Sequence, residues 1–232
     1  MTKIQLPRKN DKGKYRISYS QLNTFIGEEA FNKILDTDGK LKNISGSTGY
    51  ILNYFMGYVF PKSPMDIYAP FGQKCEAYIA EGIKDDLSEP ERKMLDKIPT
   101  LSNFQELVEI DFGDFVIEGF IDNCNADRSH IVDFKTASVA SSKKYEKQDY
   151  YQLDIYAMDY YKKFGRIPEK MEVIVIERGG SHFKPPLMVK GSFVIPKSTS
   201  IEKMEYVEND VILPTVQKIS DCFKLFKKVQ KL

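Results

Sequence analysis

Residues 117–136, IEGFIDNCNADRSHIVDFKT, constrain the fold of this chain more than any other stretch. Two apolar runs, 116–122 and 130–135, are rich in β-branched and aromatic residues, and the polar sequence between them is typical of a turn. The pattern therefore predicts two neighbouring antiparallel strands. Both strands carry charged side chains where a buried strand would carry apolar ones, among them Asp122 and Asp133.

The charged residues of the two predicted strands have a fixed geometrical relation. Side chains alternate between the faces of a strand, so Asp133 and Lys135 point to one face and Phe134 to the other. With Asp122 on the adjacent strand, two carboxylates and one ammonium group are expected at one place. Such a set suits a hard divalent cation and an attacking water. The alternative is a solvated salt bridge between Asp122 and Lys135, worth less than about 1 kcal/mol. The residues alone leave both interpretations open.

The flanking segments indicate how the sheet continues. A strand at 104–110 precedes a turn at 111–114 that contains glycine, which predicts a hairpin with the strand that follows. A helix at 145–164 leads to a near-continuous apolar run at 171–177, typical of a buried strand parallel to an earlier one. We therefore predict a mixed α/β fold with a central mixed β-sheet flanked by helices.

The remaining segments are mostly helical in pattern. Apolar spacing and capping residues predict helices at 17–35, 69–83, 88–98 and, with Pro214 as a break or kink, 201–232. A β extension is expected at 189–195, and 137–142 is expected to be a small polar loop. The aromatic residues between 49 and 60 fit a helix core better than a surface that stacks on bases.

Length and composition limit the class of protein. A chain of 232 residues with 42% hydrophobic residues can bury a sizeable core, and we predict a loose arm at 1–16 followed by one domain, 17–232. That domain has its core at 68–178 and a C-terminal extension at 179–232. No run of 18 apolar residues and no signal peptide is present, so we expect a soluble protein that binds no membrane and lies in the cytoplasm of a bacterial or phage-infected host cell. The net charge of +1 means that any basic surface must be local.

The three cysteines exclude some classes of site. Cys75, Cys124 and Cys222 are far apart and lack C-x-x-C spacing, which argues against zinc or a disulfide framework. We expect free thiols in a reducing compartment. The chain also has no P-loop and no helicase motif, so it does not power its own movement with ATP.

Three motifs in order carry a resemblance to a known family. GFID at 119–122, VDFK at 132–135 and a Gln152-x-x-x-Tyr156 helix resemble the PD-(D/E)XK nuclease superfamily in its RecB-like branch. Glu76 follows Gly72 at the position of the first family motif, where lambda-type and YqaJ-type viral exonucleases also have glutamate. The resemblance covers roughly residues 68–178 and implies a restriction-endonuclease-like core.

The resemblance implies a metal-dependent DNA nuclease. It makes Asp122, Asp133 and Lys135 the catalytic residues, and its metal ligands for Mg²⁺ or Mn²⁺ are Glu76, Asp122, Asp133 and the main-chain carbonyl of Phe134. Gln152 and Tyr156 would hold DNA. The basic cluster that lies nearest in sequence, Lys143, Lys144 and Lys147, is expected to help them. The four cysteines of an iron–sulfur cluster, found in some relatives, are missing, so no such cluster is expected.

The family analogy favours an exonuclease of phage-type recombination or DNA processing. Its expected partners are DNA and a single-strand annealing or other recombination protein, and a homo-oligomer is a further expectation. Two other functions stay open: a structure-specific or nicking endonuclease of the same fold, and a non-catalytic DNA-binding or assembly module. At the level of residues, Gln152 and Tyr156 have an alternative as well, since the two side chains can simply bond to each other.

Overall fold

The computed structural model describes residues 11–26, 67–84, 86–181 and 183–229. The aromatic stretch between 49 and 60, the first ten residues of the predicted arm and residues 27–35 of the predicted 17–35 helix lie outside the described residues. Within the described part, no helix is long and apolar enough to cross a membrane.

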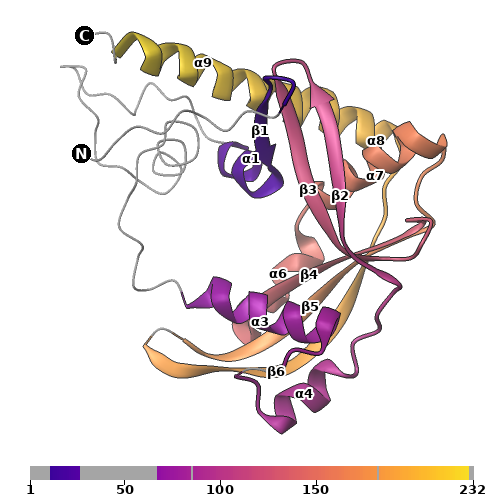
Figure 1. Ribbon diagram of the computed structural model, residues 1–232, viewed down its shortest axis with the longest axis vertical. Helices are drawn as coiled ribbons and strands as arrows, with labels where there is room; N and C mark the ends of the chain where they lie inside the picture. Colours follow the sequence, from indigo (N-terminus) through magenta and orange to yellow (C-terminus); the bar gives the residue numbers. More distant parts are fainter. Residues whose placement is uncertain (1–10, 27–66, 85, 182, 230–232) are drawn as a thin grey trace. The chain divides into compact units, whose positions relative to one another are not determined.

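Six strands are described, and they confirm the predicted mixed α/β class (Figure 1). They are β1 (Tyr15–Ser18), β2 (Asn103–Phe112), β3 (Phe115–Cys124), β4 (His130–Ser138), β5 (Lys170–Ser181) and β6 (Lys184–Lys197). Their pairing order is β1-β3-β4-β5-β6, and β2 also pairs with β3. The β1–β3 and β4–β5 pairs are parallel, whereas β3–β4 and β5–β6 are antiparallel.

Helices precede, separate and follow these strands. In the described residues they are α1 (Tyr19–Phe25), α3 (Tyr68–Glu81), α4 (Glu89–Leu95), α5 (Val139–Ser142), α6 (Lys144–Lys147), α7 (Tyr151–Phe164), α8 (Ile201–Tyr206), the π-helix η2 (Val207–Ile212) and α9 (Leu213–Val229). The predicted helices at 69–83 and 88–98 are confirmed as α3 and α4. Pro214 is the second residue of α9, and its missing N–H and its ring disturb regular α-helical bonding to the π-helix turn just before it.

Contacts divide the described chain into two compact units. One consists of residues 11–26, 108–119 and 205–229, and the other of the remaining described residues between 67 and 204. Compactness does not show that a unit folds alone, so a single domain over 17–232 stays a prediction.

The smaller unit corrects the expected start of the first helix. Ile17 lies in β1 and is fully buried, and the helix begins only at Tyr19. The cause is long-range, because β1 pairs in parallel with β3 through Ile17 and Ile117. Arg16 and Glu118 form an ion pair on neighbouring register positions. Helical spacing of apolar residues does not reveal such a pairing.

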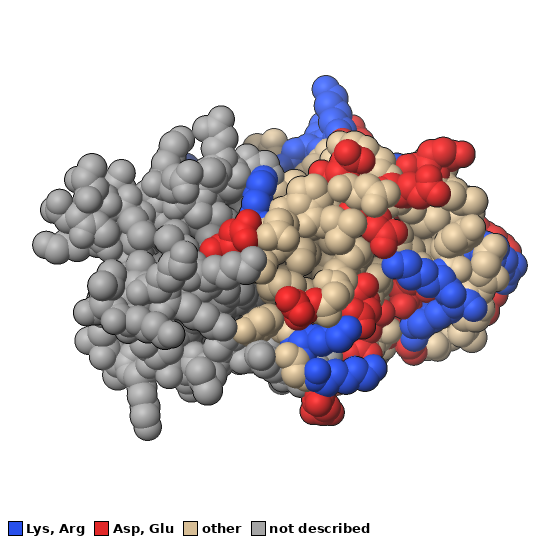
Figure 2. Space-filling view, turned by 90° about the horizontal axis from the view of Figure 1, so that it is seen from above, with Lys and Arg blue, Asp and Glu red and all other residues tan. Residues whose placement is uncertain are grey.

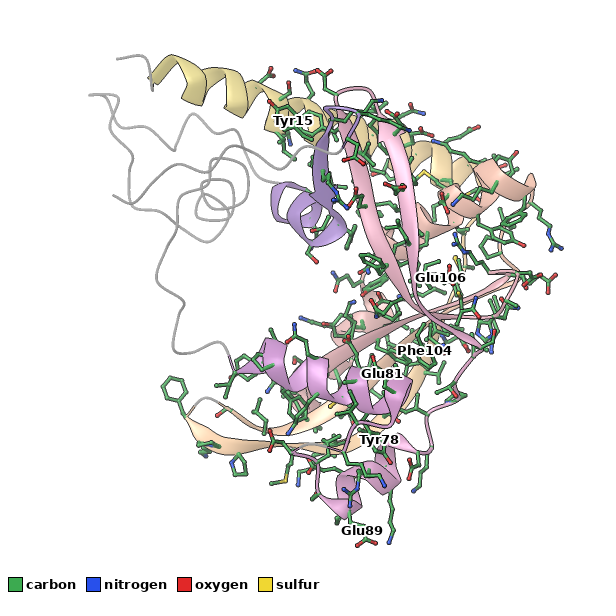
Figure 3. The ribbon with its side chains drawn as sticks, in the orientation of Figure 1. Tyr15, Tyr78, Glu81, Glu89, Phe104 and Glu106 are labelled. Atoms are coloured by element: carbon green, nitrogen blue, oxygen red, sulfur yellow. The ribbon has the colours of Figure 1, made fainter. Side chains whose placement is uncertain are left out.

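In the larger unit, α3 and α4 cover one face of the β4–β5–β6 part of the sheet. Their buried side chains, with those of the strands, form one core: Phe71, Cys75, Leu87, Leu95, Ile98, Val132, Phe134, Ile174, Ile176 and Val189. A Cβ atom on Gly72 would lie 3.3 Å from Thr136 Oγ1, so glycine lets α3 approach β4 closely. Tyr78 of α3 donates a hydrogen bond of 2.7 Å to Asp96, just after α4, and so ties the two helices together (Figure 3).

Helix α4 begins with a capping box and also holds β6. The side chain and the N–H of Ser88 both donate to Glu91 Oε2, at 2.6 and 2.9 Å. The other oxygen of Glu91 accepts the N–H of Val189 on β6 at 3.0 Å. One carboxylate therefore joins the start of a helix to a strand 98 residues away.

Two expectations about residues 137–164 were wrong in detail. Ala137 and Ser138 continue β4, because β4 pairs with β5 as far as Ser138 and Arg178, and a short helix replaces the rest of the predicted loop. The predicted 145–164 helix is divided into α6 and α7. Tyr150 separates them with φ −112° and ψ 68°, and its side chain is buried.

Candidate functional site

The two predicted carboxylates are adjacent at the junction of β3 and β4. Antiparallel pairing at Asn123–Val132 places Asp122 and Asp133 at the next positions along the two strands. The N–H of Phe134 donates to Asp122 Oδ2 at 2.7 Å, which ties the Asp122 side chain to the strand that carries Asp133. All of these residues belong to the larger unit.

Asp133 is the most constrained acid of the site. Its side chain is fully buried, and its Oδ2 atom lies 2.6 Å from Lys135 Nζ and accepts the Tyr150 hydroxyl at 2.7 Å. Its Oδ1 atom is also buried but has no hydrogen-bond partner within the described residues. A buried polar atom without a partner costs about 1–3 kcal/mol, and such atoms in native structures usually have a functional reason or an ion or water as partner.

Burial and neighbouring acids raise the pKa values of Asp122 and Glu76. Burial and then the neighbouring Asp133 raise the pKa of Asp122 to about 8, although Lys135 and the Phe134 N–H act in the opposite direction. Burial also raises the pKa of Glu76 on α3, Asp133 adds to that rise, and Lys135 reduces it. Glu76 therefore lies within electrostatic range of the two aspartates, and its role as a metal ligand stays a prediction.

Lys135 is held as a cation. Burial alone would lower its pKa, but Asp133, Asp122 and Glu76 together raise it above the ordinary lysine value. The ammonium lies 5.7 Å from the centre of the Tyr150 ring, and the side chain keeps 29% of its surface exposed. The salt bridge that we weighed as an alternative, between Asp122 and Lys135, is replaced by an ion pair within β4.

Gln152 and Tyr156 bond to each other, as the alternative interpretation had it. Gln152 Nε2 donates to the Tyr156 hydroxyl at 2.7 Å, and that hydroxyl donates to the carbonyl of Phe120 at 2.8 Å. Phe120 lies two residues before Asp122, so helix α7 braces the end of β3. The contact of these two side chains with DNA stays a prediction.

The predicted basic cluster lies after β4 on short helices. Lys143, Lys144 and Lys147 are all exposed, and Lys144 Nζ lies 5.0 Å from the centre of the Tyr145 ring. On the described part of the face in Figure 2, lysine and arginine side chains lie beside aspartate and glutamate side chains. Any basic binding surface is therefore local, in keeping with the net charge of +1.

Sequence reasoning missed Tyr150. We expected it inside a helix, whereas it precedes α7 and places its hydroxyl on Asp133 and, at 3.4 Å, near Gln152 Oε1. Gln105 was missed as well; its Nε2 atom lies 3.4 Å from Asp122 Oδ1 and its φ is +54°. The only local signal for Tyr150 was its place two residues before Gln152.

The donor set fits a divalent cation in part. Asp133 Oδ1 is a buried oxygen with an open coordination position, and Asp122 and Glu76 supply the excess negative charge that a cation relieves. Within the described ranges, however, no three His, Cys, Asp or Glu side chains are already arranged to hold a metal.

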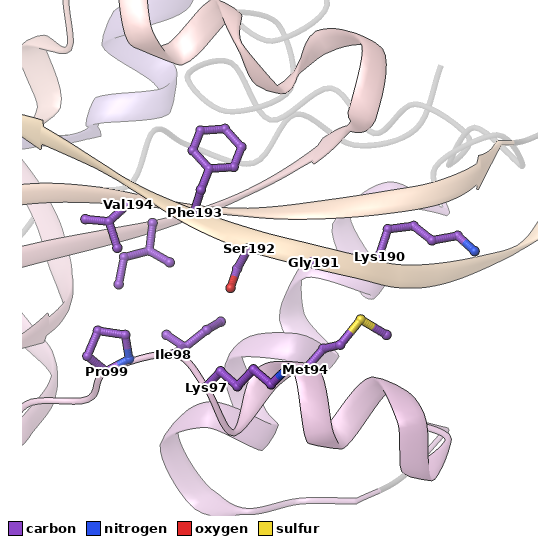
Figure 4. A pocket seen from close by; sticks show the side chains of 10 residues that line it. Met94, Lys97, Ile98, Pro99, Lys190, Gly191, Ser192, Phe193 and Val194 are labelled. Carbon is purple, nitrogen blue, oxygen red and sulfur yellow. The ribbon is translucent and has the colours of Figure 1, made fainter.

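A separate pocket lies between α4 and β6 in the same unit (Figure 4). Its volume is about 380 Å³, and it contains none of the predicted site residues. Phe193 and Ser192 point to opposite sides of β6, as alternation on a strand requires. The lining residues are Met94, Lys97, Ile98, Pro99, Ile174, Lys190, Gly191, Ser192, Phe193 and Val194.

The cysteines of the larger unit are structural. Cys75 and Cys124 are free, as expected, and both are fully buried, which raises the pKa of their thiols to about 12 and about 11. Thiols with such pKa values are not reactive nucleophiles at neutral pH.

Comparison with known proteins gives little beyond this geometry. No protein-family model and no curated protein matches the chain. Among solved structures, the chain is similar to a protein of Eubacterium rectale named "Putative exonuclease", with 12% identity and a TM-score of 0.47. The match covers 88% of this chain and 81% of the other. At this low similarity, the function has to be argued from the residues of the chain itself.

Proposed function

We propose that this protein is a metal-dependent deoxyribonuclease that hydrolyses DNA phosphodiester bonds, and that it acts as an exonuclease. One observation carries the proposal: Lys135 and Tyr150 hold one oxygen of Asp133 while the other is buried without a partner, beside two further acids. A purely structural ion pair has no need of Asp122 and Glu76, whose mutual repulsion costs stability.

Each residue of the cluster has a distinct proposed role. Asp133, Asp122 and Glu76, with the main-chain carbonyl of Phe134, would hold one or two Mg²⁺ or Mn²⁺ ions. When bound, such ions draw negative charge from the scissile phosphate and lower the pKa of a bound water. Lys135, held as an ammonium group, orients the attacking water and stabilises the charge that develops on the phosphate.

Tyr150 positions Asp133. Its hydroxyl and the Lys135 ammonium both bind Oδ2, so that Oδ1 would be the oxygen left to bind a cation. A partner of this kind fixes the orientation of a metal ligand, and its loss typically lowers metal affinity or activity by about 10- to 100-fold.

DNA would be held on the side of α7 and of the short helices before it. Gln152 is partly exposed, so its amide has capacity for a phosphate besides its bond to Tyr156. Lys143, Lys144 and Lys147 are exposed and suit phosphate contacts. The order of the three motifs and the glutamate at position 76 favour an exonuclease of phage-type recombination or DNA processing, with a single-strand annealing or other recombination protein as partner, in an oligomer and in a bacterial cytoplasm.

The test is a time course on two DNA substrates. An end-labelled linear duplex and a covalently closed circle are incubated with the full chain and Mg²⁺, Mn²⁺ or a chelator. An exonuclease shortens the linear duplex and leaves the circle intact. Nicking of the circle would instead assign an endonuclease of the same fold. Absence of cleavage with either metal, in a protein that binds the duplex, would leave only a non-catalytic DNA-binding module.

A further inference from the structure

The last four residues of β5 and the whole of β6 form a β-arm, defined here as residues 178–197. From residue 178 to residue 201 the chain has no aspartate or glutamate, although it contains 33 of them in total and its net charge is only +1. The same stretch contains four cations: Arg178, Lys184, Lys190 and Lys197. A local excess of positive charge without acids is the electrostatic footprint of a polyanion site.

Three of these cations are available for a ligand. Lys197 donates to the carbonyls of Tyr145 and Gln148 and therefore has a structural use. For Arg178, Lys184 and Lys190, in contrast, no ion pair is found within the described residues. Lys184 and Lys190 are exposed as well.

The tip of the β-arm presents an aromatic side chain to solvent. Phe183 is 84% exposed, more than any other large apolar side chain among the described residues. The turn that carries it is tightly folded, since a Cβ atom on Gly180, whose φ is +80°, would collide with the Pro186 carbonyl. Only glycine fits such a turn, so the exposed position of Phe183 is set by a specific backbone conformation.

The base of the β-arm pairs a guanidinium group with an aromatic ring. Arg178 lies 4.0 Å from the centre of the Tyr68 ring on α3, and its Nε atom is buried with no hydrogen-bond partner in the described part of the chain. An arginine stacked in this way keeps its donors directed in one plane, which suits a phosphate.

The alternative is that these residues only protect the edge of the sheet from pairing with other chains. β6 is the last strand in the pairing order of the described residues, and lysines and prolines on an edge strand prevent pairing with other chains. Edge protection, however, works with charges of either sign and does not explain the lack of acids. It also does not explain Phe183, because an exposed phenylalanine promotes association.

The β-arm extends from the strand beside the candidate site. Val175 of β5 is the register partner of Lys135, and Arg178 is the partner of Ser138 at the end of β4. Three residues of a strand span about 10 Å, so Arg178 lies about 10 Å along the strand from the level of Lys135. Because three is an odd number, its side chain is on the opposite face of the sheet. The turn with Phe183 lies farther along the same ribbon, whose two strands run on below α3 in Figure 1.

We propose that the β-arm binds a single strand of DNA, with Arg178, Lys184 and Lys190 on its phosphates and Phe183 stacked on an unpaired base. The choice of DNA rests on the proposed nuclease function, while the basic charge and the exposed ring are independent of it. Lysine and arginine contacts give salt-dependent affinity for phosphates, and a single aromatic ring stacks on bases only where they are unpaired.

The experiment compares binding of a fluorescent single-stranded oligonucleotide with that of a blunt duplex of the same sequence. Fluorescence anisotropy is measured on the full chain in chelator, so that no cleavage occurs. Lys184→Gln with Lys190→Gln should weaken single-strand binding by about tenfold or more and lower the salt slope by about 1.4, two contacts at about 0.7 each. Phe183→Ala should weaken single-strand binding by about tenfold and change duplex binding much less.

The matched control is Lys84→Gln with Lys93→Gln, which removes the same charge from two exposed lysines outside the β-arm. The proposal expects this variant to bind as wild type does. Unchanged DNA binding by the β-arm variants, with increased aggregation, would show that the residues only protect an edge. An equal effect of Phe183→Ala on both DNAs would overturn the stacking contact.

The experiments distinguish an error in the β-arm proposal from an error in the proposed nuclease function. If the chain binds single strands through the β-arm but cuts no DNA with Mg²⁺ or Mn²⁺, the nuclease proposal fails and the β-arm stands. If the wild type cuts DNA and the β-arm variants bind and cut as it does, the β-arm proposal alone is wrong.

Discussion

The carboxylate cluster and the β-arm lie next to each other in the fold but are built in opposite ways. In the cluster, short bonds from Lys135, Tyr150 and the Phe134 backbone hold one oxygen each of Asp133 and Asp122, and the other oxygen of Asp133 is left open. In the β-arm, by contrast, Lys184, Lys190 and Phe183 are exposed to solvent. Chemistry at one phosphorus atom needs preorganised groups, whereas holding a polyanion needs mainly charge and an aromatic surface.

The largest expected effect concerns the cluster alone. Lys135→Ala and Asp122→Asn should each lower cleavage of end-labelled duplex by about 1,000-fold or more, because each removes charge that acts on the transition state. DNA binding through the β-arm, measured by anisotropy in chelator, should stay within about twofold of wild type. Wild-type cleavage by either variant would refute the site.

Tyr150→Phe should have an intermediate effect, a loss of metal affinity, and so tests whether Tyr150 positions Asp133. Loss of the hydroxyl frees Asp133 Oδ2 from one of its two partners, so we expect Mn²⁺ affinity to fall by about 10- to 100-fold. Titration calorimetry with Mn²⁺ and no DNA measures this directly. As a control, Tyr145→Phe removes the hydroxyl of a nearby tyrosine whose ring packs on that of Tyr150. Equal Mn²⁺ affinities of wild type and Tyr150→Phe would contradict the positioning role.

Glu91→Gln tests what holds the β-arm in place. Hydrogen bonds from Ser88 and from the Val189 N–H hold the pKa of Glu91 below its usual range, although burial acts against them. A lowered pKa means that Glu91 contributes stability above the unfolded pKa, and that this contribution is lost as the pH falls through the folded pKa. At pH 7 the variant should lose about 1–2 kcal/mol of unfolding free energy.

Urea denaturation at a series of pH values measures the effect of Glu91→Gln. The difference between wild type and variant should shrink as the pH is lowered from 7 to about 3. A constant difference over that range would show that the charge of Glu91 is not what stabilises the contact with β6.

The smallest expected effect is a change in unfolding free energy, and its sign shows whether the acid cluster has a functional or a structural role. Because burial and Asp133 raise the pKa of Asp122 to about 8, the carboxyl destabilises the protein in the absence of metal. Asp122→Asn should therefore increase the unfolding free energy in chelator by about 1 kcal/mol while it abolishes cleavage. The β-arm variants should leave stability unchanged. A loss of stability in Asp122→Asn would favour a structural role for the aspartate.

Much of the carboxylate cluster could be predicted from the sequence because the patterns that place its residues are local. Alternation along a strand places Asp133 and Lys135 on one face, and a short turn between two apolar runs pairs the strands that carry Asp122 and Asp133. The mixed sheet, the α3 and α4 helices and the parallel strand β5 follow from equally local patterns. The roles of these residues toward metal and DNA remain proposals that the experiments above test.

Only the tertiary structure decided which atoms meet. Local sequence patterns do not predict that Lys135 pairs with Asp133, or that Tyr150 lies between two helices and donates to the same carboxylate. They also do not predict that Ile17 belongs to a strand. These choices depend on packing between segments far apart in the chain, since burial raises the cost of every polar atom left without a partner. The sequence by itself determined which chemical groups lie together in the middle of β4, and long-range packing determined which oxygen was left open.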